Sequence, residues 1–448
     1  MRKLLILCLA LGMVTMFLGC EKFLDEKPNK KLTIPSTIQD LQALLDQHQN
    51  VNALDAASGE VSADDYYVTD ADFARQTETD RRMYTWQRSY IYAPQLNDWY
   101  NVYTPLYRFN TVLVEADKAK LNGGNEAARN ELKGQAYFLR ARVLFTALTL
   151  WANAYQPNTA GTDLGIPLRL DVNFNEKSER STVEQSYLQV VSDLVKAVHL
   201  LSDKSLHSLR ANKAAAYALR ARVHLAMQDF TKAALDADSC LQIKSTLIDF
   251  SGLNANANYP IGQFNAEVLF AATMNTPNIL VSTYAKVSPQ LYASYESDDL
   301  RKAIFFRKNT DNSYAFKGSY DGTATRFTGL STNEVYLIRA EANARNNRLE
   351  DATKDLNTLL VKRYKSGTYQ SVSLDQKALL SKILFERKKE LAFRGIRWLD
   401  LKRLSVIGEG VNLSKSIDGQ LYELPAISKS YILPIPELVV DLSGIEQN

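Results

Sequence analysis

The chain has 448 residues, of which 46% are hydrophobic and 23% are charged, so it can bury a large core and is not a disordered protein. Its 53 basic residues nearly balance its 50 acidic residues, and no stretch carries a clustered basic surplus. This balance argues against nucleic acid as a partner, because neutralising phosphate groups requires such a surplus.

The first residues describe an export signal. A basic start precedes an apolar run from Leu4 to Leu18, which is short for a membrane span. An ordinary signal peptide with an incidental cysteine is one interpretation, but Leu18-Gly19-Cys20 resembles the lipobox of bacterial lipoproteins. We therefore predict a lipoprotein signal peptide over residues 1–19 and a lipidated Cys20, whose acyl chains would anchor the protein to a membrane.

The three cysteines allow no internal disulfide bond if Cys20 carries lipid. Cys8 would be removed with the signal peptide, and only Cys240 would remain as a thiol. Cys240 lies in a stretch with helical spacing, so we expect a small buried side chain there.

Residues 20–36 are polar and contain two prolines, which favours a tether between the lipid anchor and a folded body. A first helix is predicted from Thr37 to about Gln47. Between residues 58 and 96 the pattern is irregular and rich in acidic and aromatic side chains. We expect an aromatic loop in this stretch.

Helical spacing of apolar residues returns at Asn97 and continues to Lys120. The phrase Tyr-x-x-Arg-Ala then occurs three times, beginning at Tyr137, Tyr217 and Tyr336. The last two copies align without a gap over about one helical hairpin, which indicates a structural repeat. Tyr and Ala four residues apart share one helix face, so a large aromatic side chain lies beside a small one that lets a neighbouring helix approach.

Further helices are predicted along the rest of the chain. Ser181-Thr182 supplies hydroxyl caps for a helix that ends near Leu201. Helical stretches follow over residues 212–227, 230–243, 332–365 and 375–394. The fold class is therefore mainly α, with tetratricopeptide-like hairpins in residues 37–244 and 331–448 and a loop-rich, irregular second lobe in residues 245–330. The repeat units are spaced too far apart for a simple solenoid.

No constellation of catalytic or metal-binding residues stands out. The four histidines lack metal-ligand spacing, and the chain has no Walker loop and no G-x-S-x-G turn. Glu386 and Glu390 lie one helical turn apart and could form an acid and base pair. Arginine and lysine residues surround them, however, which favours a salt-bridged helix face. We predict no enzyme activity and no cofactor.

Aromatic and polar residues in the irregular stretches are the candidates for ligand binding. Tyrosine and tryptophan rings can stack on the apolar face of a sugar or a peptide, while carboxylates and amides bond hydroxyl groups. The alternative is that most of these rings belong to the core, as we expect for Trp99, Trp151 and Trp398. The predicted ligand-binding residues are Asp64, Asp65, Tyr67, Trp86, Tyr90, Tyr92, Asn97, Tyr284, Tyr292 and Tyr295.

Several phrases together resemble the SusD/RagB family of lipoproteins from Bacteroidetes outer membranes. They are Phe23-Leu24-Asp25-x-x-Pro28 after Cys20, YFLRARVLF in the first repeat, FERKKELAFRGIRWLDLKRL from Phe385 to Leu404, and ILPIPELVV. The resemblance covers essentially the whole chain, and the phrase from Phe385 to Leu404 is its most specific part.

The resemblance implies a surface protein of the outer membrane, anchored by lipid and facing outwards. It would capture an oligosaccharide or a peptide and deliver it to a TonB-dependent β-barrel transporter of the SusC type, on which the helical repeats would dock. The alternative is a lipid-anchored helical-repeat scaffold of an outer-membrane complex that has no small ligand of its own.

Overall fold

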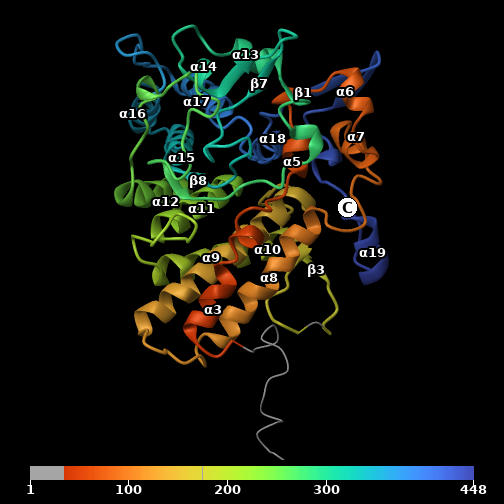
Figure 1. Cartoon of the computed structure of the whole chain (residues 1–448), viewed down its shortest axis with the longest axis vertical. Helices are drawn as coiled ribbons and strands as arrows, with labels where there is room; N and C mark the ends of the chain where they lie inside the picture. The colour runs from red at the N-terminus through yellow and green to blue at the C-terminus, as the bar shows by residue number, and fades with distance from the viewer. Residues whose placement is uncertain (1–34, 174) are drawn as a thin grey trace, which may run out of the picture.

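The computed structural model describes residues 35–173 and 175–448, so the predicted signal peptide, Cys20 and most of the tether lie outside the described residues. Figure 1 shows a mainly helical body with a few short strands, which confirms the predicted fold class. The longer helices are α8 (Asp98–Glu115), α9 (Glu126–Trp151), α10 (Val183–Leu200), α11 (Lys213–Ala226), α12 (Phe230–Ile243), α15 (Thr332–Arg345), α16 (Leu349–Leu360) and α17 (Gln376–Glu390).

Shorter elements connect and cover these helices. The short helices are α3 (Ile38–Leu45), α4 (His48–Val51), α5 (Ser58–Ser62), α6 (Asp70–Ala74), α7 (Glu78–Tyr84), α13 (Pro289–Ala293), α14 (Arg301–Phe305), α18 (Arg397–Ser405) and α19 (Glu437–Ser443). The antiparallel strand pairs are β1 (Tyr66–Tyr67) with β5 (Lys286–Val287), β2 (Leu164–Pro167) with β3 (Arg180–Thr182), β4 (Val268–Phe270) with β8 (Leu330–Ser331), β6 (Phe306–Lys308) with β7 (Tyr314–Phe316), and β9 (Leu413–Ile417) with β10 (Gln420–Leu424).

Side-chain caps begin the helices where the sequence predicts them. Thr37 caps α3 and Thr182 caps α10, and each forms a reciprocal capping box with the third residue of its helix. Asp375 caps α17 through the backbone N–H of Ala378.

The repeated phrase Tyr-x-x-Arg-Ala forms one packing device in three places. In each copy the arginine lies over its own tyrosine ring, with 5.2–5.7 Å between guanidinium and ring centroid. Each arginine also pairs through two nitrogens with an aspartate of the following helix; the pairs are Arg140–Asp193, Arg220–Asp236 and Arg339–Asp355. The alanine of each copy is completely buried, as the close approach of a neighbouring helix requires.

The helical hairpins pack one against the next, although an irregular insert interrupts them. Helices α8 to α12 form a row in chain order, and α15 then packs directly on α12. The chain between Ile243 and Thr332 therefore leaves the row and returns to the same place. The repeats therefore do not form a simple solenoid, as expected, but the hairpins on either side of the insert still meet, because contact between hairpins needs proximity in space and not in sequence.

The stretch from residue 58 to 96 is more ordered than the predicted aromatic loop. It contains α5, α6 and α7, and Thr69 and Thr77 cap the last two of these helices. Much of it is buried, because α5 packs against α7 and α18.

Most of the buried apolar side chains belong to one core that extends from α3 to the strands β9 and β10. A smaller cluster lies between α15, α16 and α17. Cys240 is completely buried, in agreement with the sequence, and this burial raises the pKa of its thiol to about 12. Among residues 35–173 and 175–448, no helix combines the length and apolar character needed to cross a membrane.

Candidate functional site

Two of the aromatic stretches predicted to bind ligand meet at one end of the molecule. Strand β1 pairs with β5, so that Tyr67 lies opposite Lys286 although the two are far apart in sequence. The backbone N–H of Ser288, which caps α13, also donates to the carbonyl of Asp65. Figure 1 shows β1, α13 and β7 close together at the top of the view.

A stacked pair of tyrosine rings lies at this end. Tyr292 of α13 and Tyr314 of β7 have ring centroids 3.5 Å apart and an interplanar angle of 15°. The ammonium group of Lys302 lies 4.9 Å from the centroid of Tyr292. Tyr67, Tyr292 and Tyr314 are each half-buried, so one part of each side chain packs and another part meets solvent. We call these three residues the tyrosine ledge.

Polar groups border the tyrosine ledge. Lys286 lies 3.8 Å from Asp311, which is in the turn between β6 and β7. Burial and the neighbouring hydroxyl of Tyr314 raise the pKa of Tyr292 to about 12. A neutral phenol can donate a hydrogen bond, while the rings offer flat apolar surfaces.

The two acidic candidates have structural partners. Asp64 pairs with Arg397 at 2.6 Å and with Lys388 at 2.7 Å, which connects β1 to helices α17 and α18. Asp65 is almost completely buried, and one of its oxygens accepts from the backbone N–H of Phe393. Both carboxylates therefore connect the start of β1 to α17, α18 and the segment between them.

Trp86 is buried and encloses an internal lysine. The ammonium group of Lys415, on β9, lies 4.7 Å from the Trp86 ring, 5.6 Å from the Tyr66 ring and 3.8 Å from the Tyr84 ring. The indole N–H of Trp86 donates to the carbonyl of Ser62 at 2.9 Å. Burial lowers the pKa of Lys415 far below its ordinary value, whereas the three ring faces favour the charged ammonium form.

Two further tyrosines from the predicted site are also internal. The hydroxyl of Tyr92 accepts from the indole N–H of Trp151 at 3.2 Å. The hydroxyl of Tyr295 donates to the carbonyl of Lys389 at 2.7 Å, and its ring lies under Arg301. Both side chains are almost fully buried, so they act in packing and not as free ligand contacts in this structure.

Tyr90 and Asn97 belong to the segment between α7 and α8, and Tyr284 precedes β5. Asn97 caps α8 with its amide oxygen and donates to the carbonyl of Ala93, so both ends of its side chain are used. Tyr90 is 65% exposed, and its backbone N–H donates a hydrogen bond to the carboxylate of Glu437. Tyr284 is half-buried in a turn.

The segment containing Tyr90 is conformationally strained. Trp86, Tyr90 and Leu96 all have left-handed backbone, with φ of 58°, 54° and 54°. Non-glycine residues adopt this conformation only where surrounding contacts enforce it, and such residues cluster at functional segments.

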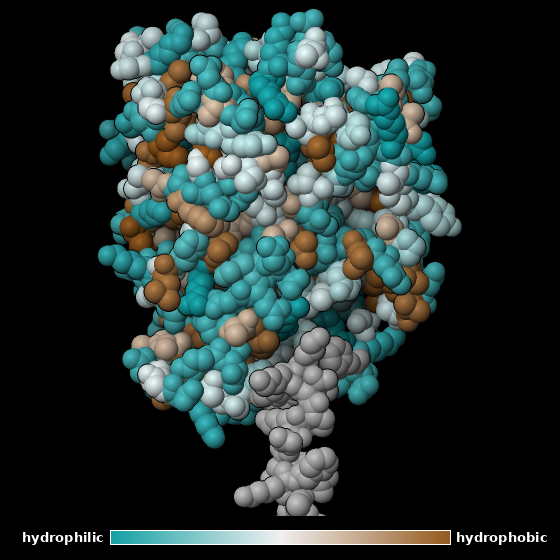
Figure 2. All heavy atoms as spheres, in the orientation of Figure 1, coloured by the Kyte–Doolittle hydropathy of each residue, from teal (hydrophilic) through white to brown (hydrophobic). Residues whose placement is uncertain are grey.

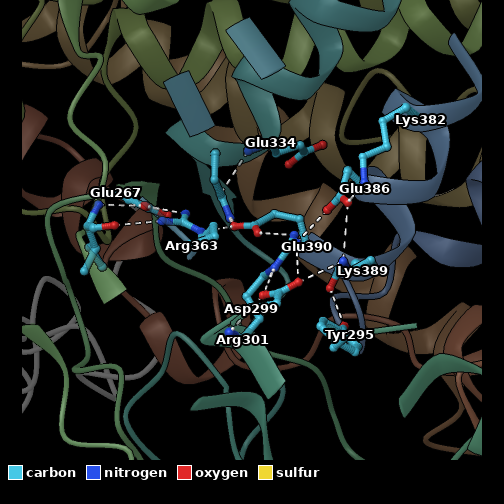
Figure 3. A network of polar contacts seen from close by, with 12 residues as sticks. Glu267, Tyr295, Asp299, Arg301, Glu334, Arg363, Lys382, Glu386, Lys389 and Glu390 are labelled. Atoms are coloured by element: carbon cyan, nitrogen blue, oxygen red, sulfur yellow. Dashed lines mark hydrogen bonds and ion pairs between the residues drawn. The ribbon is translucent and has the colours of Figure 1, made fainter. Parts of the chain in front are cut away.

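Glu386 and Glu390 lie inside a buried network of charges, which Figure 3 shows. Arg301 binds both carboxylates, and Arg363 bridges Glu390 to Glu267. All five side chains are completely buried. The prediction of ion pairs instead of an acid and base pair agrees with these contacts. Lys382 and Lys389 of the same helix also pair with Glu386, whereas the arginine partners come from other segments, and the face is buried.

A cavity of about 220 Å³ lies beside α8, and its lining includes none of the predicted ligand residues. The stacked rings of Trp99 and Tyr103 form one wall, and Arg169 and Asp171 supply polar groups. Val439 closes it from α19, where Figure 2 shows hydrophobic side chains gathered on the right of the view. Leu442 of α19 is 80% exposed.

Tyr314 is the member of the ledge that the sequence reasoning missed. A signal for it exists, because the polar run Asn309-Thr310-Asp311-Asn312 separates two short stretches rich in aromatic residues, as in a β-hairpin. Within the described part of the chain, no group of three or more His, Cys, Asp or Glu residues could hold a metal ion.

Two family models match this chain. Residues 22–225 match the model described as "Starch-binding associating with outer membrane", and residues 290–448 match the model described as "SusD family". SusD-like protein P2 of Formosa agariphila is 24% identical, over 72% of this chain and 75% of the relative.

Solved structures share the fold. A putative sugar binding protein from Bacteroides vulgatus superposes with a TM-score of 0.76 at 20% identity, covering 93% of this chain and 99% of the other. A laminarin binding SusD-like protein superposes with a TM-score of 0.67 at 18% identity, covering 91% and 97%. The coverage extends over both the helical row and the insert.

Proposed function

Because the chain belongs to the SusD/RagB family, we propose that it is a cell-surface lipoprotein that binds an oligosaccharide and delivers it to a TonB-dependent SusC-like transporter. A peptide is the second ligand class in this proposal. The protein acts by binding and release, without catalysis or a cofactor.

The tyrosine ledge is the observation that carries the proposal. Its paired rings present flat apolar surfaces, and sugars expose similar flat faces of C–H groups between their hydroxyls. Lys286, Lys302 and Asp311 are close enough to bond hydroxyl groups at the border of the ledge. The names of two structural neighbours, a putative sugar binding protein and a laminarin binding protein, support a carbohydrate as the ligand.

The ledge is an open surface, which fits a protein that must release its ligand again. An exposed site with a few ring contacts gives modest affinity and fast dissociation, and affinity differences arise mostly from the dissociation rate.

The proposals of a lipid anchor and of a transporter partner are based on the sequence and on the family. Cys20 of the lipobox would carry the lipid, and the family description of association with the outer membrane supports this location. The row of helical hairpins offers an extended surface for docking on a transporter.

The test is calorimetry of the purified protein, without its signal peptide, against a panel of oligosaccharides and peptides. Tyr292→Ala and Tyr314→Ala should each weaken binding of the ligand found. Because one aromatic contact contributes about 0.5–1.5 kcal/mol, we expect roughly two- to tenfold weaker binding for each substitution.

Tyr100→Ala is the control, because Tyr100 is also a tyrosine with an accessible side chain, 48% exposed, but lies on α8. Binding that survives both ledge substitutions and is lost with Tyr100→Ala would contradict the assignment of the site. A protein that co-purifies with an outer-membrane barrel but binds no ligand of the panel would favour the scaffold alternative.

A further inference from the structure

Each tyrosine of the tyrosine ledge has a lysine beside it. Tyr67 and Lys286 are directly opposite each other in the antiparallel pair of β1 and β5. Tyr314 and Lys308 are opposite each other in the same way in the pair of β7 and β6. Side chains of directly opposed residues share one face of such a pair, so each lysine extends on the same side as its tyrosine.

The third pair is formed between two helices. Lys302 of α14 places its ammonium group 4.9 Å from the ring centroid of Tyr292 and donates to the carbonyl of Tyr295 at 2.8 Å. A lysine ammonium group has three donors, so two donors of Lys302 have no partner among the described residues. The ledge therefore combines three aromatic rings with three positive charges.

The positive charges of the ledge exceed the negative charges beside them. Lys302 and Lys308 form no ion pair within residues 35–173 and 175–448. Asp311, at 3.8 Å from Lys286, is the one carboxylate that pairs with any of the three lysines in this part of the chain. The whole chain, in contrast, is nearly balanced, with 53 basic and 50 acidic residues.

The acidic residues between α13 and α14 have other partners. The hydroxyl of Tyr364 donates to the carboxylate of Glu296 at 3.1 Å. Lys365 pairs with Asp298 at 2.9 Å. Both partners belong to the segment after α16, so these two carboxylates do not compensate the lysines of the ledge.

We propose that the tyrosine ledge selects oligosaccharides that carry anionic groups, either the carboxylate of a uronic acid or a sulfate ester. This inference rests on the proposed function, because it concerns the ligand of the same site. A ring of the ledge stacks on the C–H face of a sugar, and the lysine beside that ring binds the anionic group at the edge of the sugar. Neighbouring positive charges repel one another, and a bound anion removes part of this repulsion.

A neutral oligosaccharide matches this border less well than an acidic one. The hydroxyl groups of a neutral sugar both donate and accept hydrogen bonds, whereas the three lysines offer donors alone. A carboxylate or a sulfate accepts hydrogen bonds without donating any, and its charge is opposite to that of the lysines. The same backbone should therefore bind more tightly when it carries an anionic group.

The test is calorimetry of the natural protein with pairs of oligosaccharides that differ in charge. The uronate arm compares oligogalacturonates with their methyl esters, and glucuronoxylan oligosaccharides with unsubstituted xylan oligosaccharides. The sulfate arm compares sulfated galactan oligosaccharides with their desulfated forms. We expect the acidic member of at least one pair to bind more tightly, by roughly two- to fivefold for each lysine that contacts the anionic group.

The arm that shows the preference identifies the anionic group as carboxylate or sulfate. Neutral members that bind as tightly as their acidic partners would overturn this inference and leave the proposed function intact. If no oligosaccharide binds at all, both the inference and the proposed carbohydrate ligand are wrong.

Two lysine variants assign the preference to the ledge. Lys302→Met and Lys308→Met should each lower the ratio of acidic to neutral affinity roughly two- to fivefold. Lys308 is exposed, so its replacement leaves the core unchanged. A ratio that persists in the protein with both substitutions would overturn the proposal.

Lys354→Met is the matched control. Lys354 is an exposed lysine on α16 and also forms no ion pair in the described part of the chain. Its replacement removes the same charge from the protein at another place. The ratio of acidic to neutral affinity should therefore stay as it is in the natural protein, and an equal fall in this variant would show that net charge and not the ledge sets the preference.

A second measurement needs the natural protein alone. Salt screens exposed charges, so raising sodium chloride from about 50 mM to about 500 mM should weaken binding of the acidic member of the pair. The affinity for the neutral member should change by less than about twofold over the same range. Equal salt dependence of the two members would overturn the proposal.

Discussion

Three neighbouring acidic residues show how their surroundings set their charge. Two cations hold the pKa of Asp64 far below its ordinary value, against the effect of burial. Burial and the negative charge of Asp64 raise the pKa of Asp65 to about 6. Burial, with a smaller contribution from Asp65, raises the pKa of Glu60 to about 8. At neutral pH Asp64, beside Arg397 and Lys388, is therefore charged and Asp65 is mostly charged, whereas Glu60 is mostly protonated.

Glu60 should make the stability of the protein fall as the pH rises. Its pKa is higher in the folded than in the unfolded state, so the folded state binds more protons between about pH 4.5 and pH 8 and loses stability across this range. At about 1.4 kcal/mol per pKa unit, the loss amounts to several kcal/mol at most. Glu60→Gln should match the natural protein at pH 5 and exceed it at pH 8 in urea unfolding.

Glu78→Gln serves as the control for this prediction, because the Glu78 side chain is largely exposed. It should leave the pH dependence unchanged. An unaltered pH slope in Glu60→Gln would show that this carboxyl is not the group responsible.

Trp86→Ala should act on stability, because the indole closes the cage around Lys415 and bonds Ser62. Removing a buried tryptophan costs roughly 3–5 kcal/mol. Tyr90→Ala, four residues away and exposed, should change the free energy of unfolding by less than about 1 kcal/mol. Urea unfolding measures both. If the Trp86→Ala protein is as stable as the natural protein but no longer binds ligand, Trp86 is a ligand-binding residue and not a structural one.

At the scale of the element, the repeat is a set of three joints between helices. In each copy the arginine stacks on the tyrosine of the same repeat and pairs with an aspartate of the next helix. The arginine therefore holds both the tyrosine ring and the neighbouring helix in place. The joints differ in burial: Asp193 is completely buried, whereas Arg339 is partly exposed and has Asp238 as a second partner.

Breaking these joints should have unequal effects. Asp193→Ala leaves Arg140 buried without its carboxylate partner, which costs roughly 3–5 kcal/mol. Asp355→Ala leaves Arg339 with solvent and Asp238, so we expect a loss of about 1 kcal/mol. The free energy of unfolding in urea checks the order. Equal losses would mean that burial does not govern the strength of the joint.

Much of this element-level structure could be predicted from sequence. The repeat and the caps at Thr37, Thr182 and Asp375 are local signals, and the helices begin where they predict. Asp236 and Asp355 follow Arg220 and Arg339 by the same number of residues in the sequence. The arginine–aspartate pairs of the last two hairpins could therefore also be predicted. The pair of Arg140 with Asp193 could not be predicted in this way, because a long connector separates the two residues in the sequence.

The candidate site was less predictable, for physical reasons. A two-residue strand such as β1 has no periodicity, so its pairing with β5 depends on tertiary contacts that no local pattern encodes. Aromatic residues in irregular stretches look alike in sequence whether they are internal, like Tyr295, or half-exposed, like Tyr292. The helices α6 and α7 had a signal that was overlooked, namely Thr69 and Thr77, each followed by an aspartate three residues later.

At the scale of the whole molecule, buried charges join the insert to the helical row. Arg301 of the insert binds Glu386 and Glu390 of α17, and Arg363 binds Glu390 and Glu267 (Figure 3). Leaving any of these charges unpaired would be strongly unfavourable. The tyrosine ledge therefore has a fixed orientation relative to the row.

In the lipobox interpretation, attachment to the membrane depends on Cys20, which lies outside the described part of the chain. Cys20→Ala should abolish labelling by a fatty-acid probe and release the protein from the membrane fraction of expressing cells. The unlabelled variant should still bind ligand, because the ledge lies elsewhere. A natural protein that stays in the membrane without label would contradict the lipobox interpretation.

The packing of α15 on α12 allows the length of the insert to vary without moving the helices on either side of it. The two ends of the insert are held side by side by this contact and by the pairing of β4 with β8, so the insert is a closed loop in the polymer sense. Doubling the length of a flexible loop costs only about 0.6 kcal/mol in closure entropy. Insertions and deletions at the tip between β6 and β7, beside Tyr314, can therefore change the surface next to the ledge while the helical row keeps its register.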